Sequence, residues 1–291
     1  MRCDHCGRDA ITFQDYSGHH LCGEHFQRDL EARAKRAIRA HGWIRTGDRI
    51  AIALSGGRSS SSLLHFLSAH FGARRDLSLV AITVDECDGS RDMDRIRGIA
   101  GGMGIEWAGI SLAEGFGDIP AGIPAPGNGE HPCPCRGFLL GRALDSLARR
   151  VGATKLALGR NLDDEARSVF LHVLMGEAAR LLCGSQPGEG VIPWMRPFFR
   201  IPEEDLSLYA RLNLQCSFQE QGLHAPLPLE SEAGRILAEF THRHPSTLFS
   251  LVNLGEALSD KGGVGSGEPH LLRCHGEVCS PRCPAREIPY G

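Results

Sequence analysis

The chain has 291 residues, of which 42% are hydrophobic and 23% are charged, and its formal net charge at pH 7 is −3. These values are ordinary for a globular protein, and they exclude a largely disordered chain and a protein that coats nucleic acid through a uniformly basic surface. No apolar run is as long as a membrane span and the first residues do not resemble a signal peptide, so we expect a cytoplasmic protein without a membrane partner.

Two pairs of metal-binding side chains lie within the first 27 residues. A Cys-x-x-Cys pair opens the chain, and a Cys-x-x-His pair follows a short insert that contains His19 and His20. In a reducing compartment cysteines stay as thiols, and clustered thiols usually bind metal. Each pair can present both donors from one turn of chain, so four ligands suffice for a closed, structural zinc site. The predicted ligands are Cys3, Cys6, Cys22 and His25, with the two histidines of the insert as alternatives.

A run of basic residues follows, between Arg28 and Arg45, and apolar residues interrupt it at helical spacing. Leu30, Ala34 and Ile38 belong to one face of the expected helix. The pattern indicates an amphipathic helix whose basic face is either solvated or directed at RNA.

The segment from Ile50 to Leu67 is typical of a buried strand, a glycine turn and the start of a helix. Its two glycines can adopt positive φ, and a run of serines follows them. Unpaired N–H groups at a helix N-terminus attract an anion, and the helix dipole and the hydroxyls of Ser59 to Ser62 add to that attraction. The spacing matches neither a Walker A loop nor a dinucleotide fingerprint. The predicted phosphate-binding residues are Leu54, Ser55, Gly56, Gly57, Arg58, Ser59 and Ser60.

Two further strands are expected, and acidic residues follow each of them. Residues 80–84 form a β-rich run that ends at Asp85, and a buried strand near residue 156 leads into a helix whose first turn contains Asp163 and Asp164. Paired carboxylates there could hold Mg²⁺ on a nucleotide or polarise a nucleophile, and the alternative is that they cap the helix. Strands that alternate with helices predict an α/β fold with a doubly wound, mostly parallel sheet, which binds ligands at the carboxyl ends of its strands.

Two cysteines in the middle of the chain are candidates for chemistry. Cys133 and Cys135 follow a loop rich in proline and glycine and stand where a helix is expected to begin. A helix N-terminus and the neighbouring Arg136 favour a thiolate, which acts as a nucleophile or a metal ligand. Cys216 stands alone, and lone cysteines are mostly small buried apolar groups.

The C-terminal part shows two patterns. Apolar spacing between residues 223 and 258 predicts packed helices that cover the sheet edge or mediate self-association, and a homodimer is one assembly we expect. After a glycine-rich linker come Cys274, Cys279 and Cys283, which predict a second zinc site with an unassigned fourth ligand. The expected domains are residues 1–27 (zinc knuckle), 28–222 (nucleotide-binding domain), 223–260 (helical extension) and 261–291 (linker and C-terminal cysteine finger), so zinc-finger-like modules flank the sheet.

Together these motifs resemble the PP-loop ATP pyrophosphatases, and within them the tRNA thiolation enzymes of the 2-thiouridine (TtuA-like) and 2-thiocytidine (TtcA-like) groups. The resemblance covers nearly the whole chain. It includes the knuckle, the Ser55–Gly57 loop, the motif from Gly159 to Ala166, the Arg196-Pro197-Phe198 segment, Cys216 and the C-terminal cysteines.

The resemblance implies an ATP-dependent tRNA sulfurtransferase, in which ATP adenylates a base carbonyl and sulfur then displaces AMP. It implies ATP and Mg²⁺ contacts from Asp85, Gly159, Asn161 and Asp163, and a catalytic role for Asp164. It also implies that Cys133, Cys135 and Cys216 act in catalysis as the ligands of a [4Fe-4S] cluster, because three thiolates leave one iron able to bind sulfide. The implied partners are tRNA and either sulfide or a sulfur-carrier protein.

The chain departs from the family pattern around this site. Ser59 replaces the aspartate of the S-G-G-x-D-S loop, Cys133-Pro134-Cys135 replaces a C-x-x-C pair, and Arg160 replaces a histidine. These departures keep two alternatives open: a PP-loop enzyme with another substrate, and a catalytically degenerate protein that binds nucleotide or RNA.

Overall fold

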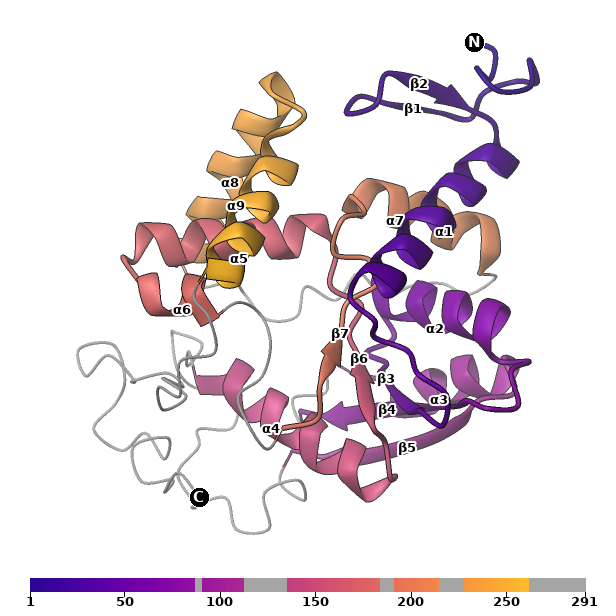
Figure 1. Cartoon of the computed structure of the whole chain (residues 1–291). Coiled ribbons are helices and arrows are strands. Elements are labelled where there is room, and N and C mark those ends of the chain that lie inside the picture. Colours follow the sequence, from indigo (N-terminus) through magenta and orange to yellow (C-terminus); the bar gives the residue numbers. More distant parts are fainter. Residues whose placement is uncertain (87–90, 113–134, 184–190, 215–227, 262–291) are drawn as a thin grey trace.

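The computed structural model describes residues 1–86, 91–112, 135–183, 191–214 and 228–261 (Figure 1). Within these ranges a sheet of parallel strands forms the centre of the molecule, and its strands lie in the spatial order β5-β4-β3-β6-β7. The strands are β3 (Arg49–Ala53), β4 (Ser78–Asp85), β5 (Glu106–Ser111), β6 (Lys155–Ala157) and β7 (Trp194–Met195). Ile50 is paired with Leu79 on one side and with Lys155 on the other, so β3 lies in the middle of the sheet.

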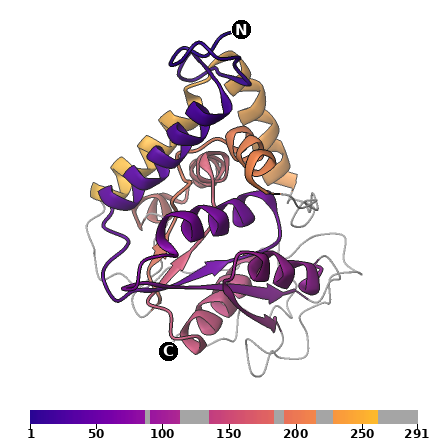
Figure 2. The ribbon, with the colours of Figure 1, turned by 90° about the vertical axis from the view of Figure 1, so that its right-hand side faces the viewer.

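Helices cover both faces of this sheet. One face carries α2 (Arg58–Phe71) and α3 (Met93–Gly102), and α7 (Glu203–Asn213) packs on the outer side of α2. The apolar side chains of these helices share a core with those of β3 and β6. The other face carries α4 (Cys135–Arg150). Figure 2 shows α2 and α4 on opposite sides of the strands.

The strands are apolar on both faces because both faces are buried. In β3, Ile50 and Ile52 pack on the α2 side and Ala51 packs on the α4 side. In β4, Ala81 packs on the α2 side and Val80 packs on the α4 side. Such continuous apolar runs are typical of parallel sheets covered by helices, and the predicted doubly wound α/β fold is confirmed.

The direction of the winding reverses between β3 and β6. From β3 the chain passes through α2 to β4 and through α3 to β5, and it then returns through α4 to place β6 on the opposite side of β3. In open α/β sheets ligands bind at such a reversal, outside the carboxyl ends of the two strands.

The remaining elements lie beyond the sheet. The hairpin of β1 (Thr12–Gln14) and β2 (His19–Leu21) leads into α1 (Gly23–Ala40), which buries Leu30, Ala34 and Ile38 as predicted. Helix α1 continues without a break across the boundary expected after residue 27. The predicted C-terminal helices are α8 (Pro228–Arg243) and α9 (Thr247–Lys261), which pack against α5 (Leu162–Leu174) and α6 (Ala178–Cys183). None of the helices described is both long and apolar enough to cross a membrane.

Candidate metal centre and nucleotide site

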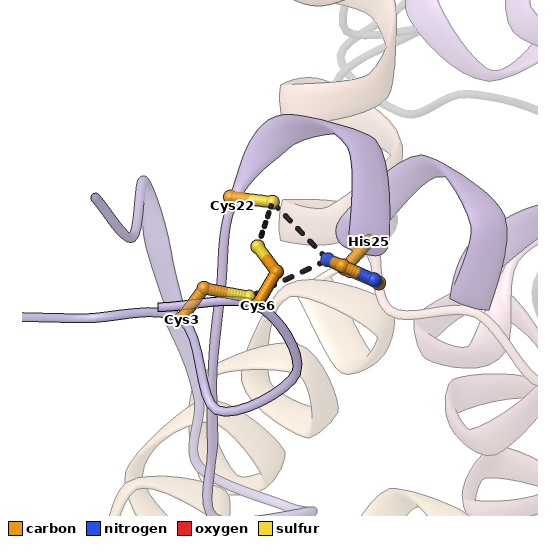
Figure 3. A group of neighbouring side chains, drawn as sticks. All are labelled: Cys3, Cys6, Cys22 and His25. Carbon is orange, nitrogen blue, oxygen red and sulfur yellow. Dashed lines mark hydrogen bonds between the residues drawn. The ribbon is translucent and has the colours of Figure 1, made fainter. Parts of the chain in front are cut away.

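All four predicted knuckle ligands come together (Figure 3). Their ligand atoms lie within 4.8 Å of one another, and His19 and His20 are not part of the group. The Sγ atoms of Cys6 and Cys22 are 3.7 Å apart, and Nδ1 of His25 lies 3.3 Å from Sγ of Cys22. Three sulfurs and one imidazole nitrogen at this spacing fit a closed tetrahedral zinc site.

The local fold explains how these ligands meet. A tight turn with Gly7 at a φ of 68° follows Cys3, and the β1–β2 hairpin returns the chain so that Cys22 becomes the N-cap of α1. His25 then lies in the first turn of that helix, next to Cys22. Nε of Arg8 donates to Sγ of Cys6 at 3.3 Å, and this hydrogen bond lowers the pKa of the Cys6 thiol to about 7. The thiolate needed for metal binding is therefore favoured.

The glycine loop after β3 is closed by its own backbone and hydroxyls. Gly56 has a φ of 80°, and Gly57 is the N-cap of α2. Oγ of Ser60 accepts a hydrogen bond from the Ser55 N–H at 3.2 Å and donates one to the Gly57 carbonyl at 3.1 Å. No side chain caps the first turn of α2, so the positive end of its dipole is open to an external anion.

Two glycines allow this loop to pack closely against its neighbours. A Cβ atom on Gly159, just beyond β6, would lie 2.9 Å from the backbone nitrogen of Ser60. A Cβ atom on Gly56 would lie 2.9 Å from Cγ1 of Ile96, in addition to the strain of a positive φ. The loop after β6 is therefore in close backbone contact with the first turn of α2, at the reversal of strand order.

Some residues of the predicted phosphate site serve the fold. Leu54 is buried, its N–H donates to the Ile82 carbonyl, and its own carbonyl accepts from Thr83. Ser61 and Ser62 are completely buried on the inner face of α2. The expectation that their hydroxyls reach a phosphate is wrong, because solvent and a solvated ligand do not reach them. Ser59 and Arg58 begin the helix, as predicted.

The acidic loop after β6 caps the N-terminus of α5 with its own side chains. Asn161 caps α5, its side chain accepts from the Asp164 N–H at 2.8 Å, and the Asp164 carboxylate accepts from the Asn161 N–H at 3.1 Å. Asp163 accepts from the N–H of Glu203, the first residue of α7, at 2.8 Å. Both aspartates thus have the capping role that was the structural alternative. Their predicted contacts with Mg²⁺ stay predictions.

The carboxyl groups here are crowded. Burial raises the pKa of Asp163, and the charge of Asp164 raises it further. Burial and the charges of both aspartates likewise raise the pKa of Glu203. Asp85 ends β4 at the same edge of the sheet. A cation would relieve this repulsion.

Sequence reasoning missed the residue that connects two of the motifs. Glu165 is buried in the first turn of α5, and its carboxylate meets Nε of Arg160 at 2.6 Å and an Nη atom of Arg196 at 2.5 Å. Arg160 and Arg196 come from segments on either side of α5, so this ion triad fixes the acidic loop to the segment after β7.

The predicted cluster and finger ligands Cys133, Cys216, Cys274, Cys279 and Cys283 lie outside the described residues. Cys135 is the first residue of α4, so the helix entrance is where it was expected.

Comparisons with known proteins agree with this architecture. Residues 2–27 match the family model of the N-terminal LIM domain of the 2-thiouridine synthetase TtuA. The chain is 29% identical to the tRNA 2-thiolation protein NcsA of Haloferax volcanii over 96% of both chains. It is 31% identical to the cytoplasmic tRNA 2-thiolation protein 1 of Bos taurus, over 88% of this chain and 76% of that protein.

A solved structure shows the same fold. It is the U34-tRNA thiolase NcsA from Methanococcus maripaludis with its [4Fe-4S] cluster, which superposes with a TM-score of 0.78 at 24% identity. The match covers 89% of this chain and 87% of that one.

Proposed function

Since this chain belongs to the family of tRNA 2-thiolation proteins, we propose that it uses ATP to replace the carbonyl oxygen of a tRNA base by sulfur. One observation carries the proposal: the motif loop after β6 contacts the first turn of α2, directly after the glycine loop, where the strand order reverses. That place suits a nucleotide, because two loops and a helix N-terminus converge there.

ATP would bind with its phosphates at the start of α2. The uncapped first turn supplies the dipole, and Gly159 keeps a Cβ atom away from the backbone of Ser59 and Ser60. Asp163, Asp164 and Asp85 would hold Mg²⁺ on the phosphates, which is consistent with the raised pKa of Asp163. Asn161 would keep the acidic loop in place through its capping bonds.

The reaction then proceeds as two substitutions. The carbonyl oxygen of the base attacks the α-phosphorus of ATP, and pyrophosphate leaves with the electron pair of the broken P–O bond. Sulfide attacks the activated carbon, and AMP leaves with the former carbonyl oxygen. The α2 dipole would stabilise the negative charge that the leaving pyrophosphate gains, and Mg²⁺ held by the aspartates would supply further positive charge there.

We further propose that Cys133, Cys135 and Cys216 hold an iron–sulfur cluster. The related thiolase from Methanococcus maripaludis carries a [4Fe-4S] cluster, and three cysteines here suit three of its four irons. When bound, such a cluster would supply an open iron for sulfide. Iron and sulfide analysis after strictly anaerobic purification tests this: four irons per chain are expected for a [4Fe-4S] cluster, and none would contradict it.

The remaining assignments belong to the same proposal. The knuckle would hold Zn²⁺, and Cys274, Cys279 and Cys283 would hold a second. The substrate would be tRNA, sulfur would come from sulfide or a sulfur-carrier protein, and the enzyme would work in the cytoplasm. Exposed apolar side chains on α8 and α9, among them Phe240 and Leu254, support a homodimer, which sedimentation would detect.

The central test is turnover. Bulk tRNA, ATP and sulfide should give AMP, pyrophosphate and a thiolated base, detected by retarded migration in a gel that contains an organomercurial. Gly159→Ala should abolish turnover, whereas Gly141→Ala, where a Cβ meets nothing within 4 Å, should not. A different result would indicate a degenerate site: the wild-type protein, loaded with its cluster, splits no ATP, and the Ser59→Asp variant does.

A further inference from the structure

A cavity lies between segments other than the glycine loop and the acidic loop. It has a volume of about 590 Å³ and lies between the β1–β2 hairpin, α1, the segment that follows β7 and α9. In Figure 1 the hairpin lies above α1, and α9 lies across from α1, beside α5. We call this cavity the α1–α9 groove. Its size is within the range of small-ligand sites.

The groove is bridged at both ends. Near the hairpin, the rings of Tyr16 and Phe249 lie 5.2 Å apart. Near the end of α1, Glu256 of α9 approaches Nε2 of His41 at 3.7 Å and forms an ion pair with Arg200. These contacts fix the hairpin and the end of α1 relative to α9, so the cavity between them is part of the folded structure.

The charges of the groove do not balance. Its two acidic groups are paired, Asp29 with Arg33 at 3.4 Å and Glu256 with Arg200. Arg33 is also fixed by the Tyr16 hydroxyl and the Arg200 carbonyl. Arg36 lines the same space from α1, is exposed, and has no ion pair or hydrogen bond with any residue that the structure describes. The groove therefore offers one cation without a protein partner.

Aromatic rings accompany this cation. Tyr16, Phe249 and Phe199 all line the groove, and the guanidinium of Arg33 covers the Tyr16 ring at 4.9 Å. Rings beside an unpaired arginine are the combination that proteins use for unpaired nucleotides, since bases stack on the rings and the phosphate meets the guanidinium.

We propose that the α1–α9 groove binds one unpaired nucleotide of the tRNA substrate, with its base against Phe249 and its phosphate at Arg36. This inference rests on the proposed function, because it takes tRNA as the substrate. The groove floor at Phe199 and Arg200 follows shortly after Arg196, which is bound to Glu165 in the first turn of α5. RNA held in the groove is therefore connected through a short buried segment to the acidic loop.

Binding of tRNA to the full-length protein tests the proposal, with Arg36→Gln against Arg39→Gln as the matched pair. Both arginines are exposed on α1, but only Arg36 lines the groove. Arg36→Gln should weaken tRNA binding several-fold and lower the salt dependence by the equivalent of about one phosphate contact, and Arg39→Gln should do neither. Equal effects of the two substitutions would overturn the proposal.

A second readout locates the base. A single-stranded oligoribonucleotide with a photoreactive thiolated base should crosslink to the peptide that carries Tyr16 or Phe249, and Phe249→Leu, which keeps the apolar packing, should reduce that product about ten-fold or more. Crosslinks confined to other peptides would contradict the proposal. The proposal would also be contradicted if free AMP, at a lower concentration than the oligonucleotide, abolished this crosslink. The groove would then be a site for free nucleotide.

The two proposals fail separately. If wild-type protein thiolates tRNA and Arg36→Gln binds and turns over equally well, only the groove proposal fails. If the oligonucleotide crosslinks in the groove but ATP and sulfide give no thiolated base, only the proposed function fails.

Discussion

The N-terminal Cys/His knuckle and the proposed nucleotide loops are both held in place by the chain, but they are specified differently. The knuckle is defined by side-chain atoms, because the sulfurs and the nitrogen of its four ligands lie within 4.8 Å. The proposed nucleotide site is defined mainly by backbone, through the open end of α2 and the contact of Gly159 with Ser60. The first is a local arrangement within one short segment, and the second exists only once the sheet has formed.

This difference has a physical consequence. Metal ligands can supply the folding free energy of a small module that has little core of its own. Backbone amides supply no such energy by themselves, and they depend on the packing around them. The two sites should therefore respond differently to loss of a ligand atom and to addition of a methyl group.

The largest expected effect is loss of the knuckle metal. Cys22→Ser should remove the zinc, and hydrogen exchange should rise throughout residues 2–22 while the strands of the central sheet stay protected. Apparent binding free energies of structural zinc in small fingers are about 10–16 kcal/mol, which far exceeds the stability of such a module. Zinc analysis and exchange mass spectrometry measure the two effects.

The matched control is His20→Gln, because His20 belongs to the same segment but not to the ligand group. It should keep its zinc. If Cys22→Ser does not fold, titration of the wild-type protein with a chelator gives the same comparison. Unchanged exchange after complete zinc removal would show that the knuckle has a core of its own.

A smaller loss is expected at the ion triad behind the acidic loop. Glu165→Gln leaves Arg196, whose side chain is 12% exposed, without its buried counter-charge. Breaking such a pair costs about 3–5 kcal/mol, and denaturant unfolding should show it. Glu239→Gln removes a solvent-exposed pair with Arg243 and should cost less than about 1 kcal/mol. If both substitutions lowered the free energy of unfolding equally, water would already screen the charge of Glu165.

The same contrast shows what could be read from the sequence. The knuckle ligands, the apolar face of α1, the glycine loop and the order of strands and helices were predictable, because each is encoded by neighbours at a regular spacing. The backbone contact of Gly159 with Ser60 was not, because it joins residues that only the sheet brings together. The burial of Ser61 and Ser62 was missed for a related reason: their helix begins at Arg58, which turns these serines toward the core.

Added methyl groups test the backbone-defined site. Gly159→Ala should destabilise the fold by about 1–3 kcal/mol and remove ATP binding, because the backbone of Ser59 and Ser60 cannot move aside without shifting α2. Gly141→Ala is the matched control: it adds the same methyl group on α4, where nothing lies within 4 Å of a new Cβ. It should fold normally. Calorimetric titration with ATP and thermal unfolding distinguish the two variants, and ATP binding by Gly159→Ala would refute a backbone-defined site.

The smallest expected effect concerns the crowded carboxyls. Because burial raises the pKa of Asp163 and of Glu203 above their unfolded values, the stability they contribute is fully present below the unfolded values and is lost as pH rises through the folded ones. At pH 7 both groups therefore favour unfolding, and a cation that binds them should restore stability. Mg²⁺ at several times its dissociation constant should add about 1 kcal/mol, by mass action.

Asp163→Asn should be slightly more stable than wild type at pH 7 without Mg²⁺ and should gain less from added Mg²⁺, whereas the two proteins should converge below pH 4. Thermal unfolding across pH, with and without Mg²⁺, measures all three. Equal Mg²⁺ responses would leave Asp163 as a capping residue alone, bonded to the Glu203 N–H, and would make the acidic loop a structural support like the triad behind it.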